Sequence, residues 1–360
     1  MCSSTTRRQL LQHAALGLLP VAGPVMAAQP LSFPRDFGAH GDFKTEWWYL
    51  TGSLQTGLPS AQSFGFQITF FRSRVDVASD STSHFAAKQL VFAHTALTDL
   101  GRQQLWHDQR IARVGFGLVD AAADDTHITL RDWTLRRTGA VSQSTYTSHV
   151  AARDFTLDLN FKQTQPLLLQ GDAGLSRKGP SPAHFSRYYT QPHLAVQGQL
   201  QYRNQSLPVQ GQAWLDHEWS DALLDKDAVG WDWIGMNLQD GSTLTAFRLR
   251  RRDGSTLWSG GSLRMRGQPS HSFADGEVRM TPGRSWLSPA TGGRYPVEWQ
   301  IDLPGARYTV RARLDNQELD SRNSTGSVYW EGLSALHDAQ GQVIGSGYLE
   351  MTGYVGALVL

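Results

Sequence analysis

Hydrophobic and polar residues alternate with a period of two along most of this chain, and turn residues separate the alternating runs. In the run at 64–70 every second residue is Phe or Ile, and in the run at 155–161 every second residue is Phe or Leu. This alternation is typical of β-strands that bury one face. Outside residues 1–28 no stretch sustains the period of a helix, so the predicted fold is all-β. Further strands are predicted at 46–54, 89–98, 127–136, 196–203, 207–215, 231–238, 243–250, 258–265, 297–301, 308–312, 326–333 and 345–354.

The number of predicted strands indicates two consecutive β domains. A chain of 360 residues exceeds the usual size of one domain, and many short strands at close spacing are typical of antiparallel barrels and sandwiches. A segment rich in Gly, Ser and Pro occupies 171–182, and a new strand pair is predicted from residue 196. The predicted domains are therefore 28–195 and 196–360.

Residues 1–27 have the composition of an export signal. Arg7 and Arg8 precede a short apolar stretch, which resembles a twin-arginine signal, and small residues offer a cleavage site after Ala27. The alternative is a membrane-tethering helix, but glycine and proline interrupt the apolar stretch. Cleavage would also remove Cys2, the single cysteine, and with it any disulfide or thiol chemistry. The expected location is the periplasm or the exterior, without stable membrane insertion.

Charge and missing motifs exclude several classes of function. The chain carries 33 Lys and Arg against 32 Asp and Glu, and this balance argues against electrostatic capture of nucleic acid. It contains no nucleophile elbow, Walker loop or dinucleotide fingerprint. His217 and Glu218 begin like a zinc-protease helix, but the fifth position is Asp221. No metal and no cofactor are therefore expected.

Three clusters of aromatic and titratable residues are candidates for function. In the first, at 40–52, Glu46 and Trp48 share one face of a predicted strand. A carboxylate beside such apolar bulk needs a partner or has a raised pKa. The alternative is that Trp48 only packs across the bottom of a barrel.

The second cluster places three titratable residues between two tryptophans, at 214–219. Strand parity puts His217 with Trp219, and Asp216 with Glu218. Histidine is the usual proton-transfer group, and a neighbouring carboxylate can orient it. We expect His217 and Trp219 to point into a cavity within reach of Glu46. The alternative is a loop of solvated charges.

The third cluster lies in the predicted strand at 231–238, where Trp231 and Trp233 share a face and Asp232 lies on the other. Segments 329–332 and 348–350 again combine tyrosine with glutamate. The alternative is core packing in the second domain, and His94 likewise fits a satisfied core histidine. The residues predicted to contact a ligand are Trp48, Tyr189, Trp219, Trp231, Trp233, Tyr329 and Tyr348.

Segments 40–52, 93–99, 211–221, 228–238 and 347–354, in this order, resemble the lipocalin-like AttH/CrtC family. The family includes secreted proteins described as hydrolases, carotenoid 1,2-hydratases and fungal pericyclases. The resemblance implies two consecutive lipocalin-like β domains with an apolar cavity near their junction.

The hydratases of this family protonate an isoprenoid double bond and add water to the resulting cation, without a cofactor. The resemblance matches their His-x-Trp pair to His217 and Trp219. Their Tyr-x-Asp pair would be expected near 244–246, where this chain has Leu-Thr-Ala.

Two hypotheses follow for the function. The first is a cofactor-independent enzyme, a hydratase or hydrolase, that acts on a lipid-like or isoprenoid-like substrate through Glu46, Asp216, His217 and Glu218. A carboxyl group that indoles desolvate stays protonated near neutral pH, and indole faces stabilise a cation. The second is a periplasmic carrier of an apolar ligand that serves an ABC-type exporter, with the same tryptophans lining its cavity.

Overall fold

The structure is a computed structural model that describes residues 30–57, 61–76, 81–83 and 85–358. The predicted export signal at 1–27 therefore lies outside the described residues. Nearly all regular structure in these residues is β, and their helical turns are limited to short 3-10 segments such as η1 (Arg35–Phe37) and η3 (Val141–Gln143). The all-β prediction is confirmed. Among the described residues, no helix has the length and hydrophobicity needed to cross a bilayer.

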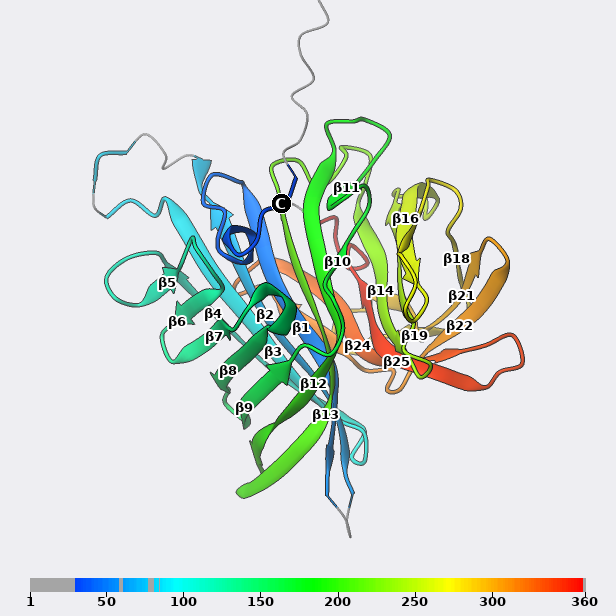
Figure 1. The fold of residues 1–360 in the computed structure, drawn as a ribbon, viewed down its shortest axis with the longest axis horizontal. Helices are drawn as coiled ribbons and strands as arrows, with labels where there is room; N and C mark the ends of the chain where they lie inside the picture. Colours follow the sequence, from blue (N-terminus) through cyan, green and yellow to red (C-terminus); the bar gives the residue numbers. More distant parts are fainter. Residues whose placement is uncertain (1–29, 58–60, 77–80, 84, 359–360) are drawn as a thin grey trace, which may run out of the picture.

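The first sheet has 13 strands in the order β4-β3-β2-β1-β13-β12-β9-β8-β7-β6-β5, with β10 and β11 paired to β12. It curves into a nearly closed barrel (Figure 1). Its strands are β1 (Thr45–Thr56), β2 (Ser63–Arg74), β3 (Gln89–Asp99), β4 (Gln104–Arg113), β5 (Val119–Ala121), β6 (His127–Leu130), β7 (Trp133–Thr138), β8 (Thr145–Ala151), β9 (Phe155–Lys162), β10 (Leu168–Leu169), β11 (Leu175–Arg177), β12 (Phe185–Tyr202) and β13 (Gln205–Ser220).

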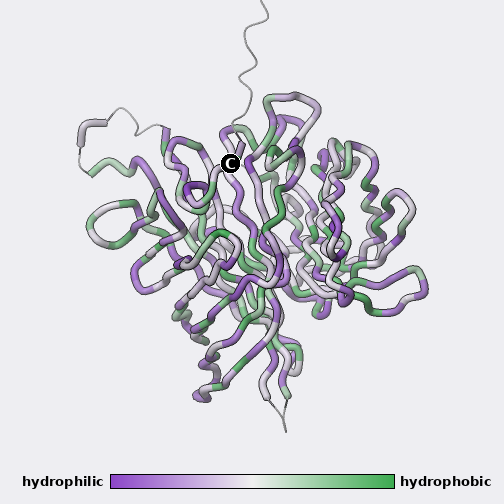
Figure 2. The backbone as a smooth tube through the Cα atoms, viewed as in Figure 1, coloured by the Kyte–Doolittle hydropathy of each residue, from purple (hydrophilic) through white to green (hydrophobic). Residues whose placement is uncertain are grey.

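The alternating sequence pattern explains the core of this barrel. Phe64, Phe66, Ile68 and Phe70 are fully buried and pack in one hydrophobic cluster with the alternating residues of β9. Hydrophobic and polar positions alternate along these strands (Figure 2). Every second side chain of a strand points to the same face, so one face of each strand fills the barrel.

The second sheet has 10 strands in the order β17-β16-β15-β14-β25-β24-β22-β21-β18, with β23 paired to β24. A hairpin of β19 and β20 forms a small third sheet. The strands are β14 (Gly230–Leu238), β15 (Thr243–Arg250), β16 (Thr256–Arg264), β17 (His271–Phe273), β18 (Arg279–Pro282), β19 (Ser285–Leu287), β20 (Arg294–Pro296), β21 (Glu298–Leu303), β22 (Ala306–Ala312), β23 (Glu318–Ser321), β24 (Ser327–His337) and β25 (Val343–Met351).

Sheet membership changes later in the chain than the predicted division at 195/196. β12 spans that position, and both β12 and β13 belong to the first sheet. The chain passes to the second sheet between Ser220 and Gly230. The loop at 171–182 and the aromatic run before residue 195 resemble the end of a domain, but the loop contains β11, the aromatic run begins β12, and β12 pairs with β13, β9, β10 and β11.

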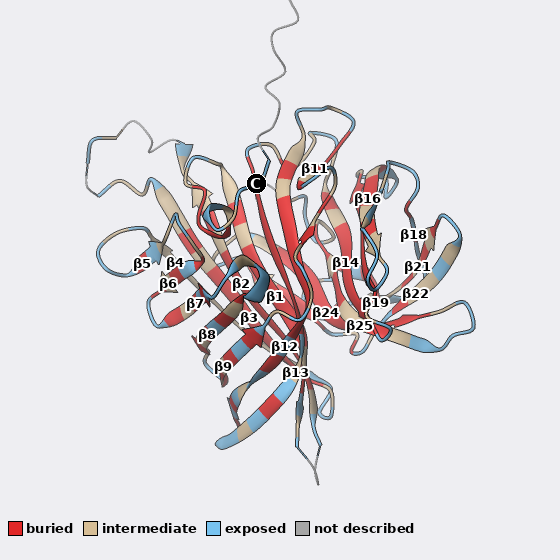
Figure 3. Cartoon of the chain, viewed as in Figure 1, coloured by how far each residue is buried: buried red, intermediate tan, exposed pale blue. Residues whose placement is uncertain are grey.

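The two sheets pack against each other along their central strands. Tyr49 and Trp214 of the first sheet join Trp233, Leu333 and Tyr348 of the second in one hydrophobic cluster. Buried residues concentrate on β1, β12, β13, β14 and β24, where the sheets approach each other (Figure 3). This packing places the outward faces of β1 and β13 opposite β14, β24 and β25.

Candidate active site between the two sheets

A cavity of about 320 Å³ lies between the two sheets. This volume matches the lower range of small-molecule sites. Aromatic and titratable side chains from both sheets contribute to its lining, which includes Trp47, Tyr49, Phe71, Phe92, His94, Lys178, Tyr188, Asp216, Glu218, Trp231, Trp233, Phe247, Tyr329, Glu331 and Glu350.

Two glutamates on neighbouring strands form the most unusual part of this lining. Glu331 on β24 and Glu350 on β25 are direct cross-strand partners. Burial is the main cause that raises the pKa of both carboxyl groups, and the charge of Glu350 adds to the rise for Glu331. Two carboxylates this close in a desolvated site do not both ionise readily. The pair therefore keeps at least one proton near neutral pH.

Polar atoms of the cavity remain open to a ligand. Tyr49 Oη and Glu331 Oε1 are buried and make no hydrogen bond of normal geometry to the described residues, although the two groups are close enough to interact with each other. A buried polar atom without a partner costs about 1–3 kcal/mol, so these atoms favour a bound polar group or water. The other oxygen of Glu331 accepts a hydrogen bond from Gln67 Nε2 at 2.9 Å.

Gln67 also ties this glutamate to a hydrogen-bonded chain that joins the sheets. Its amide donates to Tyr329 Oη at 3.2 Å, and that hydroxyl lies 2.8 Å from His94 Nδ1. His94 Nε2 lies 2.8 Å from Ser324 Oγ. Burial lowers the pKa of His94 to about 3, so its ring is neutral. This series of hydrogen bonds holds the Glu331 carboxyl group in place.

Asp216 and Glu218 share one face of β13, as strand parity predicts, and this face lines the cavity between the sheets. Asp216 accepts hydrogen bonds from Tyr188 Oη at 2.8 Å and Thr190 Oγ1 at 2.6 Å. Burial nevertheless raises the pKa of Asp216 to about 7. Glu218 pairs with Lys178 at 2.9 Å, a residue of the predicted loop at 171–182. Carboxyl groups from both sheets thus line the same cavity.

His217 points in the opposite direction, into the barrel. Its Nε2 lies 2.9 Å from Glu46 Oε1 and its Nδ1 lies 3.1 Å from Tyr189 Oη. The ring is completely buried and stacks on Trp48, with centroids 4.4 Å apart. Burial lowers the pKa of His217 to about 4, which leaves the ring neutral. The prediction that His217, Trp219 and Glu46 lie together is confirmed, but the His217 and Trp219 rings pack in the barrel interior.

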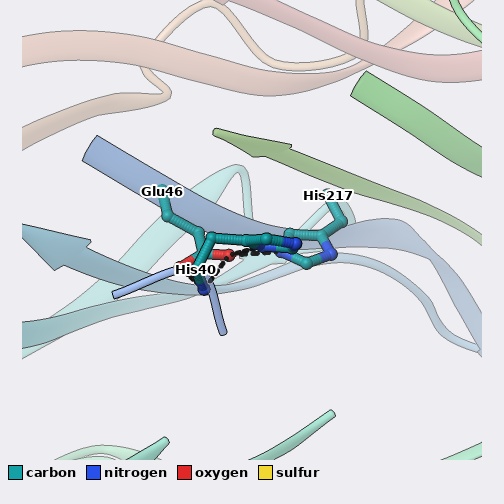
Figure 4. Close-up of side chains that lie close together, drawn as sticks. All are labelled: His40, Glu46 and His217. Carbon is teal, nitrogen blue, oxygen red and sulfur yellow. Dashed lines mark hydrogen bonds and ion pairs between the residues drawn. The ribbon is translucent and has the colours of Figure 1, made fainter. Parts of the chain in front are cut away.

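Glu46 is the centre of a buried polar cluster, shown in Figure 4. Its carboxylate contacts His217, His40 Nδ1 at 2.7 Å and Arg72 Nε at 2.7 Å. Burial alone would raise the pKa of Glu46, but hydrogen bonds with His217 and His40 hold it well below the usual range. The sequence implied that the Glu46 carboxylate has a partner or a raised pKa. The structure supplies the partners, and the pKa of Glu46 is lowered.

The same cluster offers donor atoms of the kind that bind zinc. The nearest ligand atoms of His40, Glu46 and His217 all lie within 4.8 Å of one another. However, Arg72 already neutralises the carboxylate at hydrogen-bond distance, and a cation at this point would meet its positive charge. The cluster therefore fits a structural ion-pair network better than a metal centre.

The structure thus divides the predicted site residues into two groups. Asp216, Glu218, Trp231, Trp233 and Tyr329 line the cavity between the sheets. Tyr348 lies in the hydrophobic cluster beside it. The side chains of Glu46, Trp48, Tyr189, His217 and Trp219 belong to the barrel interior, although Glu46 borders the cavity.

Sequence reasoning did not select Glu331, Glu350, Lys178 or Tyr49. The sequence carries a signal for the glutamates, since Tyr329 precedes Glu331, and Tyr348 precedes Glu350, at the same two-residue spacing. That spacing puts each tyrosine and glutamate on one strand face. Only the pairing of β24 with β25 brings the two glutamates together.

A family model described as AttH-like matches residues 24–354. The chain belongs to the AttH-like family. The crystal structure of a Nitrosomonas europaea protein assigned as AttH shares 43% sequence identity with it, with a TM-score of 0.84. That match covers 92% of this chain and 99% of the other. The recognised family and the fold are thereby confirmed.

The AttH-like chain is also related to a hydratase. Kievitone hydratase from Fusarium solani subsp. phaseoli is 21% identical over 179 residues, which are 48% of this chain and 50% of that protein. The chain thus aligns with half the length of this curated relative. The crystal structure of kievitone hydratase from Nectria haematococca shares the fold, with a TM-score of 0.69 and 13% identity over 91% of this chain and 94% of that one.

Proposed function

We propose that this AttH-like protein is a cofactor-independent hydratase that adds water to a carbon–carbon double bond of an apolar, isoprenoid-like substrate. The observation that carries the proposal is the buried Glu331–Glu350 pair, which holds a proton in a cavity lined by aromatic rings. Relationship to a hydratase supports the same reaction. The acid is thus assigned to the cavity and not to His217, which has no access to it.

In the proposed reaction, the neutral carboxyl group of the pair protonates the less substituted carbon of the double bond. The π bond breaks, a C–H bond forms, and a tertiary cation remains opposite the new carboxylate. A water molecule then forms the C–O bond and gives its proton to that carboxylate. The product is the substrate plus one water, and the pair returns to its starting state.

The remaining lining has two roles in this proposal. The ring faces of Trp231, Trp233 and Tyr49 stabilise the cation, each by about 1–2 kcal/mol in a desolvated site. Asp216 and Glu218 offer acceptor oxygens that orient the attacking water. A proton donor on one wall of the cavity and hydrogen-bond acceptors for water on the other form an arrangement that suits acid–base catalysis.

Location and the carrier function also remain proposals. We propose export to the periplasm or the exterior because of the twin-arginine pattern at 1–27. A carrier that serves an ABC-type exporter is the alternative to the hydratase. It would use the same aromatic cavity but would need no proton donor.

The test is incubation of the purified protein with isoprenoid alkenes, and with kievitone, in ¹⁸O-labelled water. Mass spectrometry is expected to show a product with one added labelled water. Glu331→Gln and Glu350→Gln should each lower kcat by at least about 100-fold while leaving binding within a few fold, since the proton is needed only in the transition state.

Glu318→Gln is the matched control, because Glu318 is a buried carboxylate of the second sheet that hydrogen-bonds to Ser288 and Thr291. It should keep wild-type kcat. Tight ligand binding without any labelled product would contradict the hydratase and favour the carrier.

A further inference from the structure

Exposed apolar side chains gather in and beside the loop that joins β4 to β5, the two end strands of the first sheet. Figure 1 shows where these two strands lie. Of the nine large hydrophobic side chains that are exposed in the described residues, five lie here. They are Phe85 (73% exposed), Ile111 (38%), Val114 (41%), Phe116 (58%) and Leu118 (47%), and we call them the apolar patch. The rings of Phe85 and Phe116 stack, with centroids 5.9 Å apart. Such concentrations on a protein surface mark interaction sites.

Basic side chains border the apolar patch. The Arg113 guanidinium lies 4.2 Å from the centre of the Phe116 ring and donates a hydrogen bond to the carbonyl oxygen of Phe85. Lys88 is exposed, and Arg131 is exposed and joined through its backbone to the Leu118 carbonyl. Two exposed acids lie near the same residues along the chain, Asp120 after the loop and Asp132 after Arg131. Aromatic rings beside cations are typical of surfaces that insert into an anionic lipid interface.

The apolar patch is continuous with the cavity between the sheets. Ile111 belongs to both, because it also lines the cavity. Its cross-strand partner on β3 is Phe92, which stacks on Phe71 with centroids 4.8 Å apart. Both phenylalanines line the cavity. Ile111, Phe92 and Phe71 thus form an apolar strip that runs from the apolar patch along the cavity wall.

We propose that the apolar patch docks on the surface of a lipid bilayer with anionic headgroups, and that an apolar substrate passes from the bilayer into the cavity along Ile111 and Phe92. This inference rests on the proposed function, because a route from the patch to the cavity matters only if the substrate is dissolved in the bilayer. The rings enter the interface, and Lys88, Arg113 and Arg131 meet the headgroups.

The test is sedimentation of the full-length protein with vesicles of phosphatidylcholine that contain phosphatidylglycerol. The wild-type protein is expected to bind them, and to bind vesicles of phosphatidylcholine alone several-fold more weakly. The double variant F85S/F116N should lose at least about ten-fold in affinity, because two rings no longer leave water. Asparagine suits position 116, where φ is 61°.

The control is the double variant M265S/L287S, which removes two other exposed apolar side chains, 50% and 53% exposed, that lie outside the patch. It should bind vesicles like the wild type, and circular dichroism should show both variants folded. The proposal would be overturned if the wild-type protein bound neither kind of vesicle, or if the two double variants lost the same affinity. Either result would leave a protein partner as the occupant of the patch. Vesicle binding needs no turnover, so a protein that docks but hydrates nothing supports docking and contradicts only the hydratase.

Discussion

Glu331 and Glu350 face each other across β24 and β25, inside a cavity that the two sheets close together. Neither residue has an arginine or lysine partner within salt-bridge distance among the described residues, in contrast to Glu46 and Glu218. Buried acids without cations are held neutral. The protein thus carries two kinds of buried carboxyl group, and their different partners assign them different chemistry.

The first prediction concerns the stability of this pair. Each carboxyl group has a higher pKa in the folded than in the unfolded protein, so the folded state binds more protons between these values. The contribution of this pair to the free energy of unfolding therefore decreases as pH rises from about 4.5 to about 7. The variant E331Q/E350Q has no carboxyl group to ionise at these positions, so it does not lose this stability. The difference in free energy of unfolding, variant minus wild type, should therefore be larger by roughly 1–3 kcal/mol at mildly alkaline than at acidic pH.

The measurement is urea unfolding across that pH range, with Glu318→Gln as control. A constant difference between the double variant and the wild type would show that the glutamates are not held neutral.

The second prediction concerns His217, which the sequence marked as catalytic and the structure places in the barrel. His217→Ala removes one of the three side chains that contact the Glu46 carboxylate, leaves His40 and Arg72 in place, and opens a cavity, so it should cost about 3–5 kcal/mol of stability. Among protein molecules that remain folded, kcat should stay within a few fold of wild type.

The pH dependence of stability gives an independent check on His217. The folded pKa is about 4 against 6.5 for a free histidine, so the unfolded state binds more protons between these values. The contribution of His217 to the free energy of unfolding is therefore fully present above about pH 6.5 and is lost as pH falls towards 4. His217→Ala should flatten this part of the curve. A variant with wild-type stability and a kcat lower by 100-fold or more would instead make His217 catalytic.

The third prediction concerns the aromatic wall of the cavity. Trp231→Leu keeps much of the apolar surface but removes the ring face that stabilises a cation. It should lower kcat by about ten-fold and change KM by only a few fold. Trp286→Leu is the control, since Trp286 packs beside the core of the second sheet and does not line the cavity. Steady-state kinetics on the labelled-water assay separate the two parameters, and a change confined to KM would mean that Trp231 only binds.

The sequence by itself determined the strands, the all-β class and the faces on which most side chains lie. Period-two alternation is a local property of the chain, so it correctly paired His217 with Trp219 and Asp216 with Glu218. Family motifs added the recognised fold. The sequence also implied that Glu46 needs a partner, because a buried carboxylate requires one. It did not identify His40 or Arg72 as that partner.

Only the tertiary structure decided which face of β13 meets the cavity. Parity separates the two faces of a strand but does not say which one lies inside the barrel and which one meets the second sheet. That choice depends on the closure of the first sheet and on its packing against β14, β24 and β25, contacts between residues far apart in the chain. The same long-range packing united Glu331 and Glu350 with Asp216 and assigned His217 to the barrel interior.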